Sequence, residues 1–449
     1  MEQAYRGSGS APFDPIVMLK MVLYQYLKGN QSPATWYEEA KLNKAMQWLG
    51  RGYVPARRTW YDFRDRAGKF IEQLHLQLIG SAIDEGHLDP SEGAQDGTSV
   101  AANASRHRMV TRPTLEKRNQ QLDAIIRGEF DEELPKWVPQ SNHGKLDLAQ
   151  RMQHASEVLA ERIEKNAKRP SGKRKDPDKI QVSLSDPMAP LGRDKLKVFR
   201  PLYTVQYVVS PTSYLIMSYC CEASVTDVGT LAPMIDKTQQ ATRGGLKAMM
   251  ADAAYCSIID LRECQQRNIE LLAPVQSNSF TKSKQADAPK KQIPRDEFVW
   301  DEELQCYHCP QGNVLSYHGR ERKRRHSGHE LWENRYRCDP TLCSVCPLVS
   351  ECLRPGSSCR MIKRLEGQEL LDAQREKMET TEVQARYKLR GQTVELAYAD
   401  SKGNRRQTSF HGRGIDRVRA ETGIMVLAQN LRRLDRLERD LLKPDNNGT

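Results

Sequence analysis

Long hydrophobic runs are absent from this 449-residue sequence. No apolar stretch approaches the roughly 20 residues that a helix needs to cross a bilayer. The opening residues, MEQAYRGSGSAPFDP, also lack the apolar centre of a signal peptide. We therefore expect neither a membrane segment nor a membrane partner.

An even, regularly spaced cysteine framework is missing as well. The 11 cysteines are an odd number, and most lie between Cys306 and Cys359. A secreted protein stapled by disulfides would spread paired cysteines through a short chain, whereas clustered thiols in a reducing compartment favour a metal.

Acidic residues are outnumbered: 58 Asp and Glu face 69 Lys and Arg, which gives a net charge of +11. Such an excess can serve solubility alone. It also suits a polyanionic partner, because released counterions drive binding to phosphate backbones. The length allows two to four domains.

The N-terminal part reads as helical. FDPIVMLKMVLYQYLKG has Pro15 at a likely first turn and stops at Gly29; a second helix opens at Ser32-Pro33 and a third near Thr59. Several arginines surround the expected turns: Arg51, Arg57, Arg58, Arg64 and Arg66. Three short helices with basic turns suit a helix-turn-helix-like DNA-binding module, and a plain helical bundle fits equally well.

After this helical part, the sequence pattern predicts a different secondary structure. GAQDGTSVAANAS predicts a strand, residues 114–166 predict polar helix, and the basic run after them contains enough Pro and Gly to be a linker. Residues 199–278 hold two strands joined by a turn, a helix capped by Thr226 or Asp227, and then alternating strand and helix. This order predicts an α/β domain.

Two aspartates, Asp96 in QDGTS and Asp252 in MMADAAY, each follow a strand-like stretch. Carboxylates at strand ends are suitable ligands for Mg²⁺, which prefers a few carboxylates, water and phosphate oxygens. Two such ions activate the attacking oxygen and stabilise the leaving oxygen of a phosphodiester. Each aspartate taken alone is equally typical of a turn or a cap.

A third acid lies in YKLRGQTVELAYADSK. At about 100° per residue, Tyr387, Arg390, Glu395 and Lys402 fall on an arc of roughly 140° that includes the apolar Val394 and Tyr398. We therefore expect Glu395 to point along the buried face, where a carboxylate needs a metal or a cation. Gly391 interrupts this pattern and is expected to mark the start of the helix.

Paired cysteines give a separate metal signal. Cys306 and Cys309 form one C-x2-C pair, and Cys343 and Cys346 form a second. Such pairs grip one tetrahedral Zn²⁺ from two tight turns, although the stretch between them exceeds the usual ribbon spacing. Other residues could substitute: Cys338, Cys352, His308, His318, His326 and His329. Buried free thiols are the alternative, and the basic RERKRRHSGH between the pairs could lie on DNA.

The motifs DGTSVAANAS, DPMAP, VQYVVS, ADAAY and Y-x2-R-x4-E-x6-K occur in this order. Together they resemble the DDE transposases of bacterial insertion sequences, of the IS-four/IS-five-like type and the subgroup with a cysteine-rich insertion. The N-terminal helical segment is similar to the domain that precedes catalysis in that family, and the resemblance covers about residues 13 to 435.

The resemblance implies an RNase H-like core whose triad, Asp96, Asp252 and Glu395, binds two Mg²⁺ (or Mn²⁺) ions. It also implies that Arg390 and Lys402 contact DNA phosphates and that Tyr387 positions the DNA end. Four residues separate Arg390 from Glu395 where the common signature has three, which weakens the role of the arginine more than that of the glutamate.

Glu421, on a strongly helical stretch, is the rival third acid; a surface or structural role suits it better. The partners implied are double-stranded DNA, at terminal inverted repeats and target sites, and a second copy of the chain. The implied location is the bacterial cytoplasm, at the nucleoid. The alternatives are a transposase-derived DNA-binding protein without catalysis and an RNase H-like nuclease without strand transfer.

The expected fold is an α/β, RNase H-like core, a mixed sheet flanked by helices, with an N-terminal all-helical domain and a zinc-ribbon-like insertion. The expected parts, in order, are a helical domain (1–88), the first core strand (89–110), a helical insertion with basic linker (111–180), the main core (181–278), the cysteine-rich insertion (279–362) and a helical end of the core (363–449).

Overall fold

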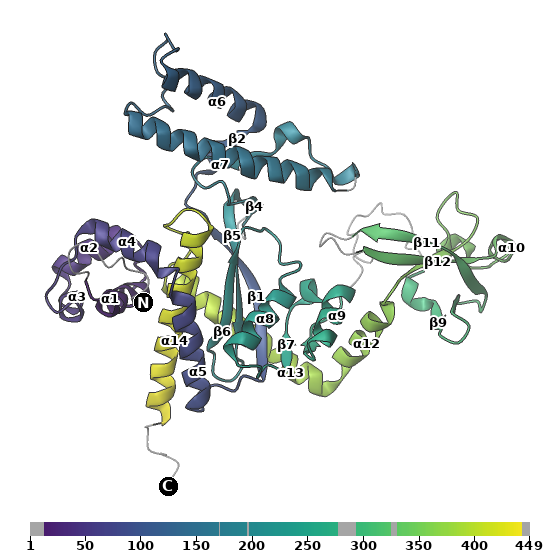
Figure 1. The fold of residues 1–449 in the computed structure, drawn as a ribbon. Helices are drawn as coiled ribbons and strands as arrows, with labels where there is room; N and C mark the ends of the chain where they lie inside the picture. Colours follow the sequence, from purple (N-terminus) through teal and green to yellow (C-terminus); the bar gives the residue numbers. More distant parts are fainter. Residues whose placement is uncertain (1–12, 170, 195–196, 277–292, 325–329, 442–449) are drawn as a thin grey trace, which may run out of the picture. The chain divides into compact units, whose positions relative to one another are not determined.

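The computed structural model describes residues 13–169, 171–194, 197–276, 293–324 and 330–441 (Figure 1). The chain divides into two units. The first comprises Met1–Asp227, Pro233–Met250 and Lys388–Thr449, and the second comprises Val228–Ala232 and Ala251–Tyr387. Each unit therefore draws on more than one stretch of sequence, and each is treated separately below.

Five helices open the first unit where the sequence predicted three. They are α1 (Pro15–Leu27), α2 (Pro33–Leu42), α3 (Lys44–Leu49), α4 (Arg57–Ala67) and α5 (Ile71–Asp84). Asp14 caps α1 by accepting the amide of Ile16 at 2.8 Å, and Asn43 caps α3 by accepting the amide of Ala45 at 2.9 Å. An asparagine inside a helical run was the missed signal, because its side chain starts a new helix as a cap.

The core of these helices is completed by a helix from the far end of the chain. Trp36 and Trp60 are fully buried and stand edge to face, with ring centroids 6.3 Å apart. Helix α14 (Ile415–Leu441) adds Ile424 and Met425 to the same cluster. In Figure 1 α14, drawn in yellow, lies beside α5. The N-terminal helices are therefore anchored to the rest of the first unit by an apolar interface.

A sheet forms the centre of the first unit. The strands that this unit contributes to it are β1 (Glu92–Ala101), β4 (Leu191–Arg193), β5 (Phe199–Val209), β6 (Ile216–Glu222) and β7 (Ala248–Met250); β8 (Glu270–Leu272) completes the six-stranded sheet. Strand β1 pairs antiparallel to β5 and parallel to β7, so the sheet is mixed as predicted. The two strands expected around the turn at residues 211–213 are β5 and β6, which confirms that prediction. Helix α8 (Leu231–Ala241) begins later than the predicted caps Thr226 and Asp227.

A helical insertion in the first unit has its own core. It contains α6 (Arg112–Arg127) and α7 (Asn142–Ala167) with the short strands β2 (Met109–Thr111) and β3 (Gln181–Ser183). Met152 and Leu122 are buried between the helices. The half-buried Arg162 donates to the carbonyls of Gln181 and Pro187 at 3.0 and 2.7 Å, which fixes the chain that leads back to the sheet.

The second unit consists of a small α/β part and a separate antiparallel sheet. The first part holds α9 (Ile258–Gln266), β8 (Glu270–Leu272), α12 (Gln368–Glu379) and the beginning of α13 (Thr381–Ala399). The sheet runs in the order β13-β12-β11-β10-β9. Its elements are β9 (Val299–Asp301), β10 (Cys306–His308), β11 (Val314–Arg324), β12 (Glu330–Cys338), β13 (Met361–Leu365) and the short helices α10 (Pro340–Ser344) and α11 (Val349–Cys352).

Candidate functional site

Asp96 lies inside β1 rather than at its end, which corrects the sequence-based placement. It stands opposite Tyr207 of β5. Its side chain is 25% exposed, so the carboxylate reaches the surface of the sheet without being fully solvated. At the next position, Gly97, the side-chain ends of Asp227 and Gln206 approach the strand so closely that an added Cβ would displace them. Polar side chains thus crowd the strand on both sides of its plane.

Arg390 of helix α13 forms an ion pair with Asp96, with its Nη2 atom 3.4 Å from Oδ2. Its side chain is only 13% exposed, and its Nε–H has no hydrogen-bond partner among the described residues. Leaving a buried donor unsatisfied is costly, so such an atom needs a reason. A phosphate oxygen is a suitable acceptor, since guanidinium groups bind phosphate with paired N–H donors.

Two further residues hold the end of α13 on β1. The hydroxyl of Tyr398 donates to the carbonyl of Asp96 at 2.6 Å, and its ring stacks on Tyr207 at 4.7 Å. The Nζ atom of Lys402 donates to the Thr98 hydroxyl and the Ser99 carbonyl, both at 2.7 Å. An ammonium has three donors, so contacts to β1 use two of those of Lys402. The sequence pattern predicted only an apolar packing role for Tyr398 and missed its hydrogen bond to β1.

The carboxylate of Glu395 is exposed, which corrects the expectation that it faces inward. Val394 is fully buried and Tyr398 is 8% exposed, so the buried face lies beside the glutamate. A helix turns about 100° per residue, and an arc of roughly 140° therefore reaches from the core to solvent. Helix α13 also continues through Gly391, which does not begin it.

Glu421 has the opposite setting. It is 2% exposed on α14, and its carboxylate accepts the backbone amides of His411, at 2.9 Å, and Gly412. Burial raises its pKa to about 7. A carboxylate whose oxygens are already occupied by backbone amides ties the 411–412 loop to α14, which is a structural role.

Asp252 and Tyr387 belong to the second unit. Asp252 follows β7 by two residues, and its Oδ1 accepts the amide of Ala254 at 2.7 Å, which caps a short turn. The cap leaves the second carboxylate oxygen available. Tyr387 is half-buried on α13, at the last position that this helix contributes to the second unit.

The triad offers the donors that Mg²⁺ takes, namely carboxylate oxygens. Asp96 uses Oδ1 to accept the amide of Gly97 at 2.8 Å, and its Oδ2 carries the ion pair with Arg390. A divalent cation that binds Oδ2 would have to displace this guanidinium, so the fit rests on the donor chemistry of the three predicted acids alone. The donor chemistry therefore fits a divalent cation.

The four predicted zinc ligands are not brought together as one set. Of these four, only Cys306 belongs to a group of three side chains whose ligand atoms lie within 4.8 Å of one another, and its companions are Asp301 and His308. Cys309 and Cys343 pack instead in the apolar core of the β9–β13 sheet. Of the other residues that could substitute, His326 and His329 lie outside the described residues.

A second pair of thiols meets in that core. Burial, and after it a hydrogen bond with Cys343, raise the pKa of the Cys338 thiol to about 12. The described cysteines therefore include two environments, one around Cys306 and one around Cys338 and Cys343, in which Cys309, Cys346 and Cys352 also interact. Residue spacing alone could not separate them.

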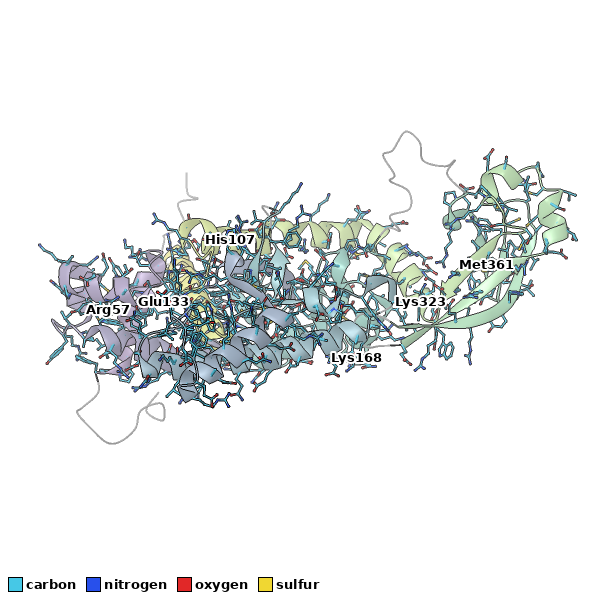
Figure 2. All side chains as sticks on the ribbon, turned by 90° about the horizontal axis from the view of Figure 1, so that it is seen from above. Arg57, His107, Glu133, Lys168, Lys323 and Met361 are labelled. Carbon is cyan, nitrogen blue, oxygen red and sulfur yellow. The ribbon has the colours of Figure 1, made fainter. Side chains whose placement is uncertain are left out.

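The basic charge on β11 is largely compensated. Arg322 pairs with Glu330, and Lys323, which is labelled in Figure 2, pairs with the buried Glu333. Arg320 stacks over the Trp332 ring at 4.4 Å. The part of the basic segment that the structure describes is thus held by acidic and aromatic partners across the strand pair, which makes it less suited to DNA than the sequence indicated.

The N-terminal arginines include one that is buried and paired and two that are exposed. Arg64 is 6% exposed and pairs with Asp65 at 2.8 Å, so it is not available to DNA. Arg57 and Arg58 are exposed and line a shallow surface depression with Tyr61 at the start of α4; Arg57 is labelled in Figure 2.

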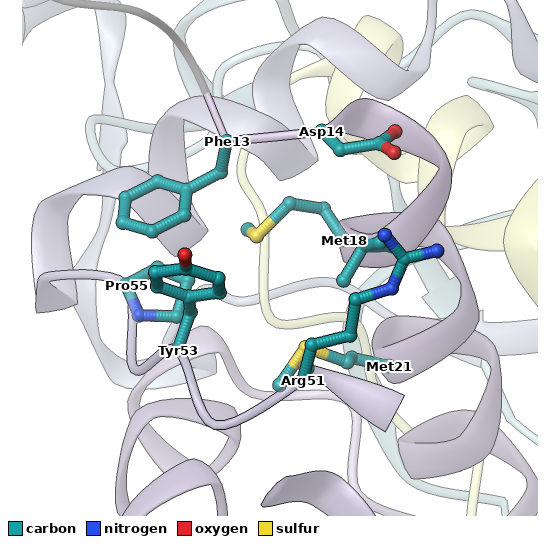
Figure 3. A pocket seen from close by; sticks show the side chains of 9 residues that line it. Phe13, Asp14, Met18, Met21, Arg51, Tyr53 and Pro55 are labelled. Atoms are coloured by element: carbon teal, nitrogen blue, oxygen red, sulfur yellow. The ribbon is translucent and has the colours of Figure 1, made fainter. Parts of the chain in front are cut away.

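A pocket of about 340 Å³ lies beside these helices (Figure 3). The Phe13 and Tyr53 rings meet edge to face at 6.5 Å at one side, and Arg51 lies at another, with Met18 and Met21 between them. The lining is mostly apolar, and its charged residues are Asp14 and Arg51.

A search for helices able to span a bilayer found none in the described part of the chain. Glu85, His87 and Glu438 form another group of possible metal ligands there, with both glutamates exposed.

Two models of known families each match part of the chain. A model described as a transposase DDE domain matches residues 308–435, and one described as a transposase domain (DUF772) matches residues 1–66. No curated protein matches the chain. The two matches support a transposase of the DDE class, an enzyme type that cuts and moves DNA with divalent metal ions. More particularly, they support a transposase of an insertion sequence, and the mixed α/β fold with its N-terminal helices is compatible with one.

Proposed function

We propose that the protein is an insertion-sequence transposase of the IS-four/IS-five-like type, which cleaves DNA at the ends of its element and joins them to target DNA. The observation that carries the proposal is the attachment of α13 to β1. Arg390, Tyr398 and Lys402, within the matched DDE segment, all contact β1 between Asp96 and Ser99. This brings the signature helix to the predicted catalytic aspartate.

The catalytic acids of the proposal are Asp96, Asp252 and Glu395. The register of β1 and β7 supports the choice of the two aspartates. Ala94 is paired with Met250, and each aspartate follows its paired residue by two positions. The exposure of Glu395 supports its choice over Glu421, whose carboxylate is buried and engaged.

Two Mg²⁺ or Mn²⁺ ions held by these carboxylates would activate the attacking oxygen and stabilise the leaving one. The residues of the chain have separate tasks. Arg390 gives its buried Nε–H and its Nη atoms to the phosphate next to the cleaved bond. Lys402 holds β1 and contacts a neighbouring phosphate, and Tyr387 positions the DNA end.

The N-terminal helices bind the terminal inverted repeats in this proposal, with Arg57 and Arg58 contacting phosphates. Two ends are joined in one event, so a dimer forms on DNA. The protein acts in the bacterial cytoplasm at the nucleoid. The domain arrangement is the one expected from the sequence, with an RNase H-like core interrupted by a cysteine-rich, zinc-binding insertion.

The decisive experiment incubates the purified full chain with Mg²⁺ and labelled duplexes that carry the inverted repeats flanking its gene. We expect nicking at the repeat end and strand-transfer products on denaturing gels, both lost with Asp252→Ala. Asp123→Ala, at an exposed position of α6, is the matched control and keeps full activity.

The two alternative functions, a nuclease and a DNA-binding derivative, predict different products in the same assay. Nicks without strand-transfer products identify a nuclease, and repeat binding without nicks identifies a DNA-binding derivative. Undiminished nicking by Asp252→Ala refutes the assignment of the triad.

A further inference from the structure

The β9–β10 hairpin of the second unit carries an unusual set of three side chains. Asp301 ends β9, and Cys306 and His308 lie on β10. The Nε2 atom of His308 is 3.2 Å from Oδ2 of Asp301 and 3.9 Å from Sγ of Cys306. All three ligand atoms lie within 4.8 Å of one another.

The hairpin register explains why they meet. Cys306 is the cross-strand partner of Asp301, and His308 lies two residues further along β10. Side chains alternate between the faces of a strand, so all three share one face. The other face carries Trp300 and Tyr307, whose rings pack 4.9 Å apart in the core of the sheet. This aromatic packing fixes which face the three ligands occupy.

The distances agree with a tetrahedral ion. With Zn–S near 2.3 Å and Zn–N and Zn–O near 2.05 Å, a tetrahedral Zn²⁺ separates S from N by about 3.5 Å and N from O by about 3.3 Å. The hairpin shows 3.9 and 3.2 Å for these two separations. These two separations differ from the tetrahedral values by at most about 0.4 Å, and the third, from Cys306 to Asp301, lies within 4.8 Å.

The chemistry of the three donors selects the class of ion. A thiolate, an imidazole and one carboxylate suit Zn²⁺ and related transition ions, whereas Mg²⁺ requires oxygen ligands. The outer side is open, because Val299, which pairs with His308, is 66% exposed. A fourth coordination position is left to water.

We propose that the β9–β10 hairpin binds one zinc-type ion through Asp301, Cys306 and His308, which clamps the two strands across the 302–305 turn. This ligand set replaces the cysteine quartet expected from the spacing, since it removes Cys306 from that quartet. The proposal does not rest on transposition, and its test does not use DNA.

The test measures Co²⁺ binding by the metal-free full chain, through the thiolate-to-cobalt absorption band and the number of ions bound. At low Co²⁺ concentration, we expect His308→Gln and Asp301→Asn each to bind one Co²⁺ ion fewer per chain than the unaltered chain does. Loss of an outer-shell partner already weakens a metal site 10- to 100-fold, so loss of a ligand weakens this one by more than about 100-fold.

His143→Gln, at an exposed position of α7, is the control and binds metal as the unaltered chain does. Circular dichroism verifies that each variant is folded. Binding by His308→Gln equal to that of the unaltered chain overturns the proposal. So does loss of the absorption band in Cys343→Ser but not in His308→Gln, because the cysteine quartet then holds the ion.

Discussion

The candidate site of the first unit and the hairpin site of the second are assembled over very different lengths of chain. Tyr398 and the Asp96 carbonyl that it bonds are 302 residues apart, whereas His308 and Asp301 are separated by 7. The first arrangement exists only when α13 has packed on β1. The second needs little more than the register of one hairpin. The proposed DNA-cleaving site thus depends on global packing, whereas the proposed metal clamp depends on local pairing.

The largest effect on DNA cleavage is expected from a substitution at Glu395. Glu395→Gln removes a proposed metal ligand, and a loss of ~4 kcal/mol in transition-state stabilisation corresponds to a decrease of about 1,000-fold in DNA cleavage. The free energy of unfolding changes by less than ~0.5 kcal/mol because the side chain is exposed. Cleavage rates and urea melts measure the two quantities.

Glu382→Gln, at an exposed position of the same helix, controls for the loss of charge and keeps the original rate. Normal cleavage by Glu395→Gln would transfer the role of third acid to another residue.

In the second unit, substitution to alanine is expected to lower local stability more in the small core than at the surface. Leu315 is fully buried on β11, so Leu315→Ala lowers local stability by about 2–5 kcal/mol through lost transfer energy and a cavity. Hydrogen exchange of the β11 and β12 amides should accelerate accordingly. The neighbouring Val314 is 46% exposed, and Val314→Ala should leave these amides nearly unchanged. Equal exchange in both variants contradicts the assignment of this core.

Glu421 provides a pH-dependent contrast with Glu395. Its pKa is about 7 in the folded chain and 4.5 in the unfolded one, so the folded state binds more protons between these values. The free energy of unfolding therefore falls as pH rises from about 4.5 to 7, by up to about 3 kcal/mol, and then levels off. Glu421→Gln has no such proton to lose. Urea melts at pH 5 and pH 8 should show a smaller difference for this variant, and an identical difference argues against the raised pKa.

The smallest effect concerns the basic residues. Arg322 pairs with Glu330 on the surface, and such pairs contribute at most about 1 kcal/mol. Arg322→Ala should change neither the stability nor the salt dependence of DNA binding appreciably. Arg57→Ala, at an exposed position of α4, should reduce the salt slope by about one phosphate contact. A salt slope reduced only by Arg322→Ala would move DNA binding to the second unit.

Much of the secondary structure followed from local pattern. Helix α1 begins at Pro15, as predicted from the place of this proline in a first turn, and β5 and β6 lie where alternation predicts them. The errors have physical causes: Asn43 starts a new helix in a continuous helical run, and Gly391 is tolerated inside α13. The residues of the candidate site could be predicted only from the order of several motifs, because a single aspartate does not by itself indicate a catalytic role.

The sequence by itself determined the charge, the helical N-terminus, the mixed α/β pattern and the acids worth testing, because these depend on composition and short-range periodicity. Only the tertiary structure decided which partner each of these groups meets. It paired Arg390 with Asp96, buried Glu421, left Glu395 exposed and placed Cys306 with Asp301 and His308. The first three of these outcomes depend on elements far apart in the chain, which spacing along the sequence does not specify. The meeting of Cys306 with Asp301 and His308 depends on the register of the β9–β10 hairpin.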